Sequence, residues 1–320
     1  MRVLVTGGAG FIGSHVCKVL AQEDHTPIVV DDLSQGHREF VKWGPFHKIS
    51  LLDKAKLFEV FEQERIEAVC HLASKSIVEE SMANPDLYLS ENVQGTVHLL
   101  EACKQFGCKR FVFSSTASVY GNPTRTPIEE DDPLNPINPY GESKLLAERK
   151  IQQAAEEWGL NFVIFRFFNA AGASFDLDIG EKHLPETHLI PRVIDALLHD
   201  RPITLFGDDY KTSDGTCERD FVHVLDIANA HLKALDMPSA VINLGLEKGY
   251  SVKFVIEQIA KKLRKIPHIQ ICKRREGDSP VLVASHKKAL EMGLIFQYGL
   301  EEMIETAIKW HTQTLAKAKL

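Results

Sequence analysis

The sequence opens with MRVLVTGGAGFIG at residues 1–13, an apolar run that ends in a glycine-rich turn. Gly7, Gly10 and Gly13 follow a candidate strand directly and open a helical pattern, as in a dinucleotide-binding βαβ unit. Glycines at this spacing permit a tight turn, bring the backbone close to a pyrophosphate, and let the helix pack on the strand. Asp31 ends the next apolar run, where its carboxylate would accept from a ribose 2′-hydroxyl and repel a 2′-phosphate. The stretch therefore predicts dinucleotide binding, with NAD favoured over NADP.

The rest of the first half alternates short apolar runs with longer helical patterns. The apolar runs are rich in Val, Ile and Phe and lie at Arg2–Thr6, Pro27–Asp31, Ala68–Leu72, Arg110–Ser114 and Asn161–Arg166. The helical patterns lie between them at Phe11–Gln22, Lys54–Glu64, Pro85–Phe106 and Tyr140–Trp158. Nearly continuous apolar runs are typical of parallel strands that are covered on both faces. This alternation predicts an α/β fold with a doubly wound parallel, Rossmann-like sheet built from βαβ units.

The alternation of apolar runs and helical patterns becomes less regular beyond the middle of the chain. We expect residues 1–170 to form the NAD-binding Rossmann-like domain, and residues 171–320 to form mainly a smaller, interleaved substrate-binding lobe. Part of 207–245 is expected to return to the first domain. In the lobe the pattern predicts elements at Pro185–His199, Ile203–Phe206, Glu218–Val224, Val224–Met237, Ser251–Arg264 and Leu300–Lys317. The proline-rich connection Asn122–Pro139 is long for a compact domain, so we expect it to act as a lid.

Composition excludes several classes of protein. Of the 320 residues, 44% are apolar and 25% are charged, which excludes a disordered or collagen-like chain. The net charge of −7 argues against a general nucleic-acid-binding surface. No run of 18 apolar residues predicts a membrane helix, and the glycine-rich start does not resemble a secretory signal. We therefore expect a protein that binds neither nucleic acid nor membrane.

Cysteine and histidine patterns restrict the chemistry further. The 6 cysteines form no CxxC pair and lie mostly in apolar stretches, which is typical of reduced thiols in a cytoplasmic protein. The 14 histidines form no HxH or HExxH pattern, so we expect no metal site.

A second motif carries the chemistry. YGESK at residues 140–144 is a YxxxK at the start of a predicted helix, so Tyr140 and Lys144 share one face. A free tyrosine has a pKa of about 10 and is a poor base at neutral pH. We expect Lys144, the positive nicotinamide ring and the helix N-terminus to lower the pKa of Tyr140 together. The hydroxyl run SST at 114–116 ends a predicted strand, where Thr116 can face a ligand.

The order of motifs along the chain resembles one known family. From residue 6 to 278 the chain contains, in order, TGGAGFIGSH, DDLS, HLAS, SENVQGT, SSTASVYG, YGESK, FRFFNAAGA, PETHLIP, DGTCERDFVHV, NLG and RREGD. On these motifs it resembles the extended short-chain dehydrogenase/reductases and, among them, the UDP-glucose 4-epimerase family. The resemblance implies NAD as cofactor, a UDP-sugar as small-molecule substrate, and interconversion of UDP-glucose and UDP-galactose through a 4-keto sugar. It implies Tyr140 as the base, Lys144 as its activating cation, and Thr116 as the partner of the reacting oxygen.

The resemblance also implies two sets of binding residues. The cofactor-binding set is Gly7, Gly10, Phe11, Ile12, Gly13, Asp31, Asp32, Ser50, Leu51, Leu72, Ala73, Asn92, Ser114, Tyr140, Lys144 and Phe167. The substrate-binding set is Thr116, Tyr140, Asn169, His188, Leu189, Thr204, Phe206, Arg219, Phe221, Val252, Arg275, Asp278 and Leu282. In the second set, Arg219 and Arg275 are expected on the diphosphate, which guanidinium groups pair bidentately, and Asp278 on the uridine ribose.

The chain departs from the family pattern at several positions. Ser50 stands where the family often has an Asp that accepts from the adenine amino group, and Ser76 replaces a Lys found near the NAD ribose or pyrophosphate. His188 stands where some members have Asn, so we expect a different polar contact to UDP. Phe167 replaces a Tyr beside the nicotinamide site. Leu282 stands where a large Tyr restricts the pocket, so we expect some turnover of UDP-GlcNAc or UDP-GalNAc.

Other activities on the same fold stay open. The 4,6-dehydratases carry an Asp–Glu pair after the catalytic Thr, whereas Ala117 and Ser118 follow Thr116 here. A UDP-glucuronate decarboxylase or a UDP-glucuronate 4-epimerase is a further alternative, the latter needing an additional cation near the sugar C6. A non-catalytic NAD-sensing regulator could dispense with the Tyr140–Lys144 pair, which this chain retains.

The resemblance finally implies a homodimer formed through paired helices. We expect the segments Pro85–Phe106 and Tyr140–Trp158 to supply the contact, through Leu99, Leu100, Leu145 and Trp158.

Overall fold

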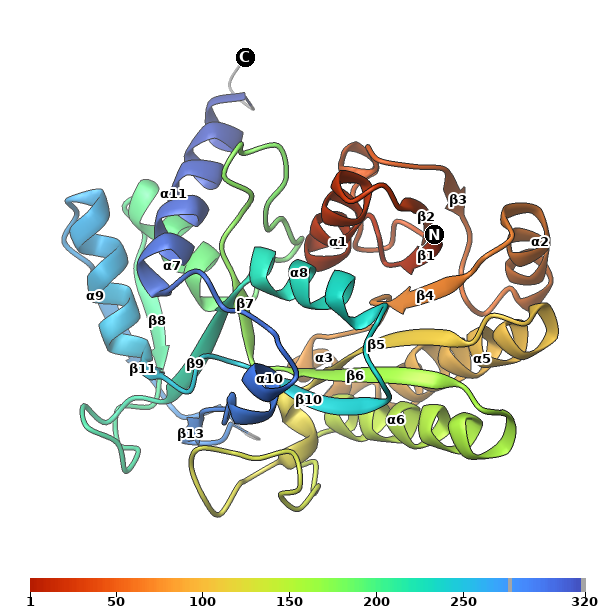
Figure 1. The fold of residues 1–320 in the computed structure, drawn as a ribbon. Helices are drawn as coiled ribbons and strands as arrows, with labels where there is room; N and C mark the ends of the chain where they lie inside the picture. Colours follow the sequence, from red (N-terminus) through yellow and green to blue (C-terminus); the bar gives the residue numbers. More distant parts are fainter. Residues whose placement is uncertain (276–277, 318–320) are drawn as a thin grey trace.

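A seven-stranded parallel sheet forms the centre of the computed structural model, which describes residues 1–275 and 278–317 (Figure 1). Its strands, in spatial order, are β3 (Phe46–Lys48), β2 (Thr26–Asp31), β1 (Arg2–Thr6), β4 (Ala68–His71), β5 (Arg110–Thr116), β6 (Asn161–Phe167) and β10 (Ala240–Leu244). Every neighbouring pair is parallel. The chain order reverses between β1 and β4, which is where doubly wound sheets bind their ligands. The predicted α/β fold is confirmed.

Helices cover both faces of this sheet, and the strands are apolar on both sides for that reason. Val3 and Val5 of β1 face a core shared with α1 (Phe11–Gln22) and α8 (Val224–Ala234), whereas Leu4 faces the other core. The opposite layer is formed by α2 (Lys54–Glu64), α5 (Gly95–Phe106) and α6 (Pro139–Trp158). Figure 1 shows α1 and α8 on one side of the sheet and α5 with α6 on the other.

The helix predicted over Pro85–Phe106 contains a π-helical segment. The chain forms α3 (Val78–Ala83) and α4 (Pro85–Tyr88), then a π-helical segment, η2 (Leu89–Gln94), before α5 begins at Gly95. The wider turn directs buried Asn92 inward, where its amide nitrogen donates to the Ser143 hydroxyl on α6 at 2.9 Å. Such π segments are frequent at functional sites. The predicted helical stretch Pro85–Phe106 is therefore confirmed, but its π segment was not predicted.

A smaller lobe is built around β9 (Glu218–His223), which pairs with three short strands. These are β7 (Asn169–Ala171), β11 (Gly249–Ser251) and β13 (Val281–Leu282). A separate parallel pair joins β8 (Ile203–Phe206) to β12 (Ile269–Cys272). The lobe's own apolar core lies among α7 (Leu189–Leu198), α9 (Val252–Leu263) and α11 (Leu300–Lys317). The remaining short helices are η1 (Arg38–Phe40), η3 (Ala117–Tyr120) and α10 (Lys287–Glu291).

The predicted elements of the lobe need two corrections. The helix expected from Pro185 begins instead at Leu189, because residues 181–188 form a separate cluster of side chains beside it. The strand β10 was not predicted, although it completes the sheet beside β6. The division of the chain at residue 170 stays a prediction.

The connection 122–139 does not behave as the predicted lid. Ile128 at its centre is fully buried and its N–H donates to the Val283 carbonyl at 2.8 Å. The Glu130 carboxylate accepts from the Asn243 N–H at 2.7 Å, which attaches the connection to β10. Among the described residues that line the ligand cavity, none belongs to this connection. It is a fixed strap along the edge of the sheet.

The leucines expected at a subunit contact are interior residues. Leu99, Leu100 and Leu145 expose 0%, 7% and 5% of their surface and pack within the chain's own cores. The prediction that these three leucines form a dimer contact was therefore wrong. Within the described residues, no helix is both long and apolar enough to cross a membrane.

A buried ion pair joins α6 to the sheet. The Arg166 guanidinium on β6 donates to both carboxylate oxygens of Glu148, at 2.8 and 3.1 Å, and to the Tyr120 hydroxyl at 2.8 Å. Arg166 also donates to the Glu130 carbonyl, and Ser115 donates to Glu148. Glu148 and Arg166 expose 1% and 3% of their surface, so each charge depends on the other for compensation.

Removing one of these charges should destabilise the fold strongly. Glu148→Gln is expected to lower the free energy of unfolding by about 3–5 kcal/mol, because the Arg166 charge stays buried without its partner. Urea unfolding followed by circular dichroism measures the change. Glu156→Gln, on the exposed face of the same helix, should change it by less than about 0.5 kcal/mol. Equal effects of the two substitutions would show that the ion pair contributes nothing.

Candidate active site

One cavity of about 950 Å³ lies at the carboxyl ends of the central strands and extends into the smaller lobe. It spans the position where the order of strands reverses, between β1 and β4. Every residue of the two predicted binding sets lines it except Asn92. Asn92 lies behind the wall, where its amide bonds Lys75 and Ser143 and so holds the loop after β4 in place.

The glycine turn after β1 has the geometry that its spacing predicts. Gly7 has a φ of +69°, which favours glycine, and its carbonyl accepts from the Gly10 N–H at 3.0 Å. A Cβ on Gly13 would lie 2.1 Å from the Gly7 carbonyl oxygen, so only glycine lets α1 approach the turn this closely. Gly10 caps α1 without a side-chain hydrogen bond, which leaves the helix N–H groups for an anion. These features fit the pyrophosphate of a dinucleotide.

Asp31 lies beside this turn with its carboxylate held by the backbone. It accepts from the N–H groups of Ala9 at 3.1 Å and Leu33 at 2.8 Å. Burial raises the pKa of Asp31, and these two hydrogen bonds oppose the rise. A Cβ on Gly36 would lie 2.7 Å from the Asp31 carboxylate, so Gly36 belongs to this site although no spacing rule pointed to it. Asp32 is exposed and accepts from the Ser34 N–H at 2.8 Å.

The rest of the predicted cofactor wall is mainly apolar. It comprises Phe11, Ile12, Leu51, Leu72, Ala73 and Phe167. Ser50 lines the cavity too, and its hydroxyl accepts from the Leu52 N–H at 3.1 Å. Together with the glycine turn and Asp31, these residues fit a dinucleotide that has a flat base and a charged centre.

The catalytic candidates come from the start of α6 and the end of β5. The Asn138 side chain caps α6 by accepting from the Gly141 N–H at 2.8 Å, and Pro139 occupies the first turn. The Lys144 ammonium donates to the Ser114 carbonyl at 2.8 Å and lies 4.8 Å from the centre of the Phe113 ring. This bond fixes the predicted helix face against the sheet.

The electrostatics of this group differ from the expectation. Burial raises the pKa of Tyr140, and a hydrogen bond with Thr116 opposes the rise. Burial lowers the pKa of Lys144 to about 7, with the Glu148 carboxylate opposing that change. Lys144 is therefore only partly charged at neutral pH, and burial, opposed by Thr116, sets the direction in which the Tyr140 pKa moves.

Two arginines mark the substrate side of the cavity. The Arg219 guanidinium on β9 lies 3.2 Å from the Asp278 carboxylate. The Arg275 guanidinium lies 4.0 Å from the centre of the Phe206 ring, which holds it at the cavity wall. The remaining substrate-side residues that line the cavity are Asn169, Leu189, Thr204, Phe221 and Val252. A positive pair with a stacked aromatic ring suits a nucleoside diphosphate.

Leu282 lies at the junction between the two lobes. It belongs to β13, next to Arg219 in register, and lines the cavity. Its side chain packs against an apolar cluster that contains Val119, Tyr120 and Leu145. Its size therefore affects the space beside the catalytic helix.

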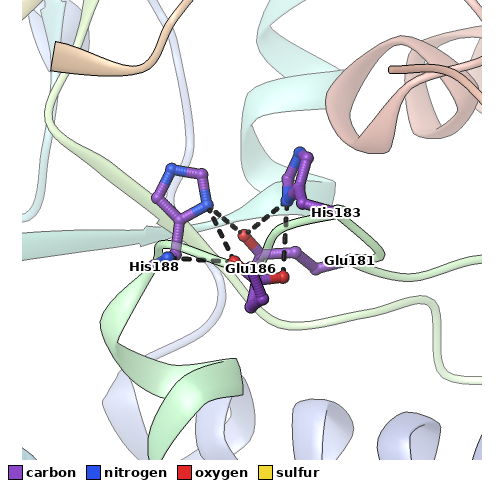
Figure 2. Close-up of side chains that lie close together, drawn as sticks. All are labelled: Glu181, His183, Glu186 and His188. Atoms are coloured by element: carbon purple, nitrogen blue, oxygen red, sulfur yellow. Dashed lines mark hydrogen bonds and ion pairs between the residues drawn. The ribbon is translucent and has the colours of Figure 1, made fainter. Parts of the chain in front are cut away.

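His188 makes a contact that its predicted role did not include. Its imidazole Nδ1 lies 2.5 Å from the Glu181 carboxylate, and His183 and Glu186 surround the same point (Figure 2). These three partners line the cavity but were missed, because their spacing matches no familiar motif.

Comparison with known proteins shows what this arrangement is similar to. Residues 3–245 match the family described as the NAD dependent epimerase/dehydratase family. A UDP-glucose 4-epimerase of Rhizobium meliloti (strain 1021) is 44% identical over 319 residues, which cover 98% of this chain and 97% of that protein.

Solved structures are similar over nearly the whole chain. The UDP-glucose 4-epimerase from Bifidobacterium longum, in complex with NAD+ and UDP, has a TM-score of 0.94 at 32% identity, covering 98% of this chain and 99% of that one. The UDP-Glc/GlcNAc 4-epimerase from Campylobacter jejuni has a TM-score of 0.84 at 37% identity, covering 98% and 99%. The resemblance seen in the sequence motifs is confirmed.

Proposed function

Because this chain belongs to the NAD dependent epimerase/dehydratase family, we propose that it is an NAD-dependent isomerase that interconverts UDP-glucose and UDP-galactose. One observation carries the proposal. A single cavity is lined by the glycine turn, by Tyr140, Lys144 and Thr116, and by the two arginines of the smaller lobe. A dinucleotide and a nucleotide sugar can therefore meet beside one base.

The residues of this chain supply the proton chemistry at the sugar. Tyr140 takes the proton from O4 while C4 becomes a ketone, and it returns that proton when the opposite configuration forms. When bound, NAD supplies the acceptor and then the donor of the C4 hydrogen. Thr116, at the end of β5, lines the cavity with Tyr140 and opposes the rise of the Tyr140 pKa, so its hydroxyl can hydrogen-bond the reacting oxygen. Lys144, held by the Ser114 carbonyl one helical turn from Tyr140, favours the phenolate when it is charged, below its pKa of about 7.

Inversion at C4 requires that the two ends of the substrate be held differently. Arg219 and Arg275 can pair with the diphosphate, which holds the nucleotide firmly. The ketone intermediate must turn within the cavity so that its other face is presented, so the sugar is held loosely. The pairing of β9 with β11 and β13 places Arg219 on the smaller lobe.

The related dehydratase activity is not favoured. It would need an acid and a base after Thr116, and Ala117 and Ser118 stand there instead, at the start of η3. The Ser118 N–H only donates to the Thr116 hydroxyl at 3.1 Å.

We further propose that N-acetylated UDP-hexoses are substrates. Leu282 is smaller than the Tyr that restricts the pocket in the family pattern, and it lines the cavity beside Leu145. The Campylobacter jejuni relative is named for activity on both UDP-Glc and UDP-GlcNAc.

We also propose a homodimer in the cytoplasm. α5 and α6 contact each other side by side (Figure 1). The exposed apolar side chains of Met82 and Leu89 belong to α3 and η2, which pack against α6. All 6 cysteines are free thiols, which supports the cytoplasmic location.

Replacing the base tests the reaction. Tyr140→Phe should lower kcat for UDP-galactose by about 100- to 10,000-fold with little change in KM, because only the proton transfer is lost. Conversion of UDP-galactose to UDP-glucose by the purified protein, without added NAD, is the measurement. Tyr298→Phe, which alters a tyrosine packed against Phe175 and His223 outside the cavity, should leave kcat unchanged. Unchanged kcat in Tyr140→Phe would exclude this mechanism.

The pH profile tests the lysine in the same reaction. The base acts as phenolate, so kcat rises with pH on the acid side as Tyr140 loses its proton. Lys144 carries its charge below a pKa of about 7 and loses it above. Lys144→Met removes the cation that favours phenolate, so the acid limb should move to higher pH. A limb that stays in place would show that Lys144 does not act through Tyr140.

Substrate range tests Leu282. Leu282→Tyr should remove turnover of UDP-GlcNAc and UDP-GalNAc and retain that of UDP-galactose, because the larger ring fills the space for the C2 substituent. Leu282→Met, which conserves volume, should retain both activities. The proposal fails if the tyrosine variant loses both activities to the same degree.

Light scattering tests the oligomeric state. The molar mass of the purified protein, measured by light scattering, should be twice the 35.9 kDa of one chain. Elution at the mass of one chain would contradict the homodimer.

A further inference from the structure

Four side chains of the segment before α7 converge on one point. Glu181, His183, Glu186 and His188 each direct one nitrogen or oxygen to it, and these four atoms lie within 4.8 Å of one another. Figure 2 shows both imidazole rings directed at the two carboxylates. Two imidazoles and two carboxylates form a donor set that suits zinc-class cations.

The separations of these atoms suit a tetrahedral site. The His183 Nδ1 lies 3.5 Å from Glu181 Oε1 and 3.5 Å from Glu186 Oε2. A cation with bonds of about 2.0–2.2 Å in tetrahedral geometry holds its ligands roughly 3.3–3.6 Å apart. The His188 Nδ1 and Glu181 Oε1 form a direct ion pair at 2.5 Å, so these two atoms must move apart for both to bind one cation.

Two of the four atoms are buried without a hydrogen bond. Within the described residues, Glu181 Oε1 and His183 Nδ1 find no partner of acceptable hydrogen-bond geometry, although both are shielded from solvent. Glu181 exposes only 4% of its surface. Glu181 Oε1 has the His188 imidazole at 2.5 Å, but His183 Nδ1 has only contacts of 3.5 Å with the two carboxylates. Buried polar atoms are normally satisfied, so the space beside His183 Nδ1 suits a shared ligand.

The backbone around the cluster already orients its ligands. Glu186 Oε1 accepts from the N–H groups of Thr187 at 2.8 Å and His188 at 2.9 Å. Glu186 Oε2 therefore faces His183. The Glu181 carbonyl accepts from the Trp310 indole at 3.0 Å, which fixes the segment against α11. Such outer hydrogen bonds are typical of protein metal sites.

We propose that Glu181, His183, Glu186 and His188 bind one divalent transition-metal cation of the zinc class. The cation fixes the segment that leads into Leu189, the first residue of α7 and part of the cavity wall. Its role is positional, and it takes no part in proton transfer at the sugar. The spacing Glu-x-His-x-x-Glu-x-His contains neither HxH nor HExxH, which is why the sequence predicted no metal site.

Direct metal binding tests the proposal. The full chain is dialysed against a chelator and then titrated with Zn²⁺ in a calorimeter and with Co²⁺ in a spectrophotometer. We expect one ion per chain, the intense visible absorption of tetrahedral Co²⁺, and a higher Tm with Zn²⁺. Absence of stoichiometric binding, or octahedral Co²⁺ absorption, would overturn the proposal and leave a cluster of protonated histidines paired with glutamates.

Variants locate the site. His183→Gln and Glu186→Gln should each weaken Zn²⁺ binding by at least about 100-fold and abolish the Co²⁺ absorption. His199→Gln is the matched control, because His199 pairs with a carboxylate, Asp195 at 3.0 Å, without a second histidine. It should bind as the unaltered chain does. Circular dichroism shows whether each variant folds. If both folded variants bind metal as the unaltered chain does, the proposal is wrong. If His183→Gln does not fold, the metal affinity of Glu186→Gln decides the question.

Discussion

The active site depends on the bond from the Lys144 ammonium to the Ser114 carbonyl, which joins α6 to β5. Along α6, Tyr140, Lys144 and Glu148 follow one another at a spacing of four residues, so they present one face to the strand. Each meets a different residue of that strand, with Thr116 beside the phenol and Ser115 beside the carboxylate. The catalytic residues and the residue of the buried ion pair therefore lie on the same face of α6, one turn apart. The ion pair of Glu148 with Arg166 thus fastens the helix that carries the base to the sheet.

Long periodic segments of the fold could be predicted from the sequence, and short or tertiary ones could not. The apolar runs of the central strands and the glycine turn before Phe11 have local causes, because their pattern is set by burial on both faces and by backbone sterics. The π segment at Asn92 depends on partners in two other elements, and β13 has only 2 residues. The strap around Ile128 looks like a flexible loop in sequence, since its burial arises from contact with Val283.

The site shows the same division. Gly13 and Asp31 could be placed from spacing, and the arginines of the lobe could be placed only through resemblance to a family. The charge state of Lys144 could not be predicted, because it follows from burial that no local pattern encodes. The cluster around Glu181 was missed for a related reason: its four side chains are close in sequence, but their convergence depends on a backbone path held by Trp310 from the far end of the chain.

The late position of β10 in the chain has a consequence for synthesis. Its five residues, Ala240–Leu244, pair with β6, which ends at Phe167, so the whole segment between them must be made first. At about 5–20 residues per second, the ribosome needs roughly 4–15 seconds to pass from one to the other. Throughout that interval the nascent sheet presents the open edge of β6, an apolar strand able to pair with any other extended chain. Because the two lobes are interleaved in sequence, the unpaired edge of β6 can therefore aggregate with other chains during translation.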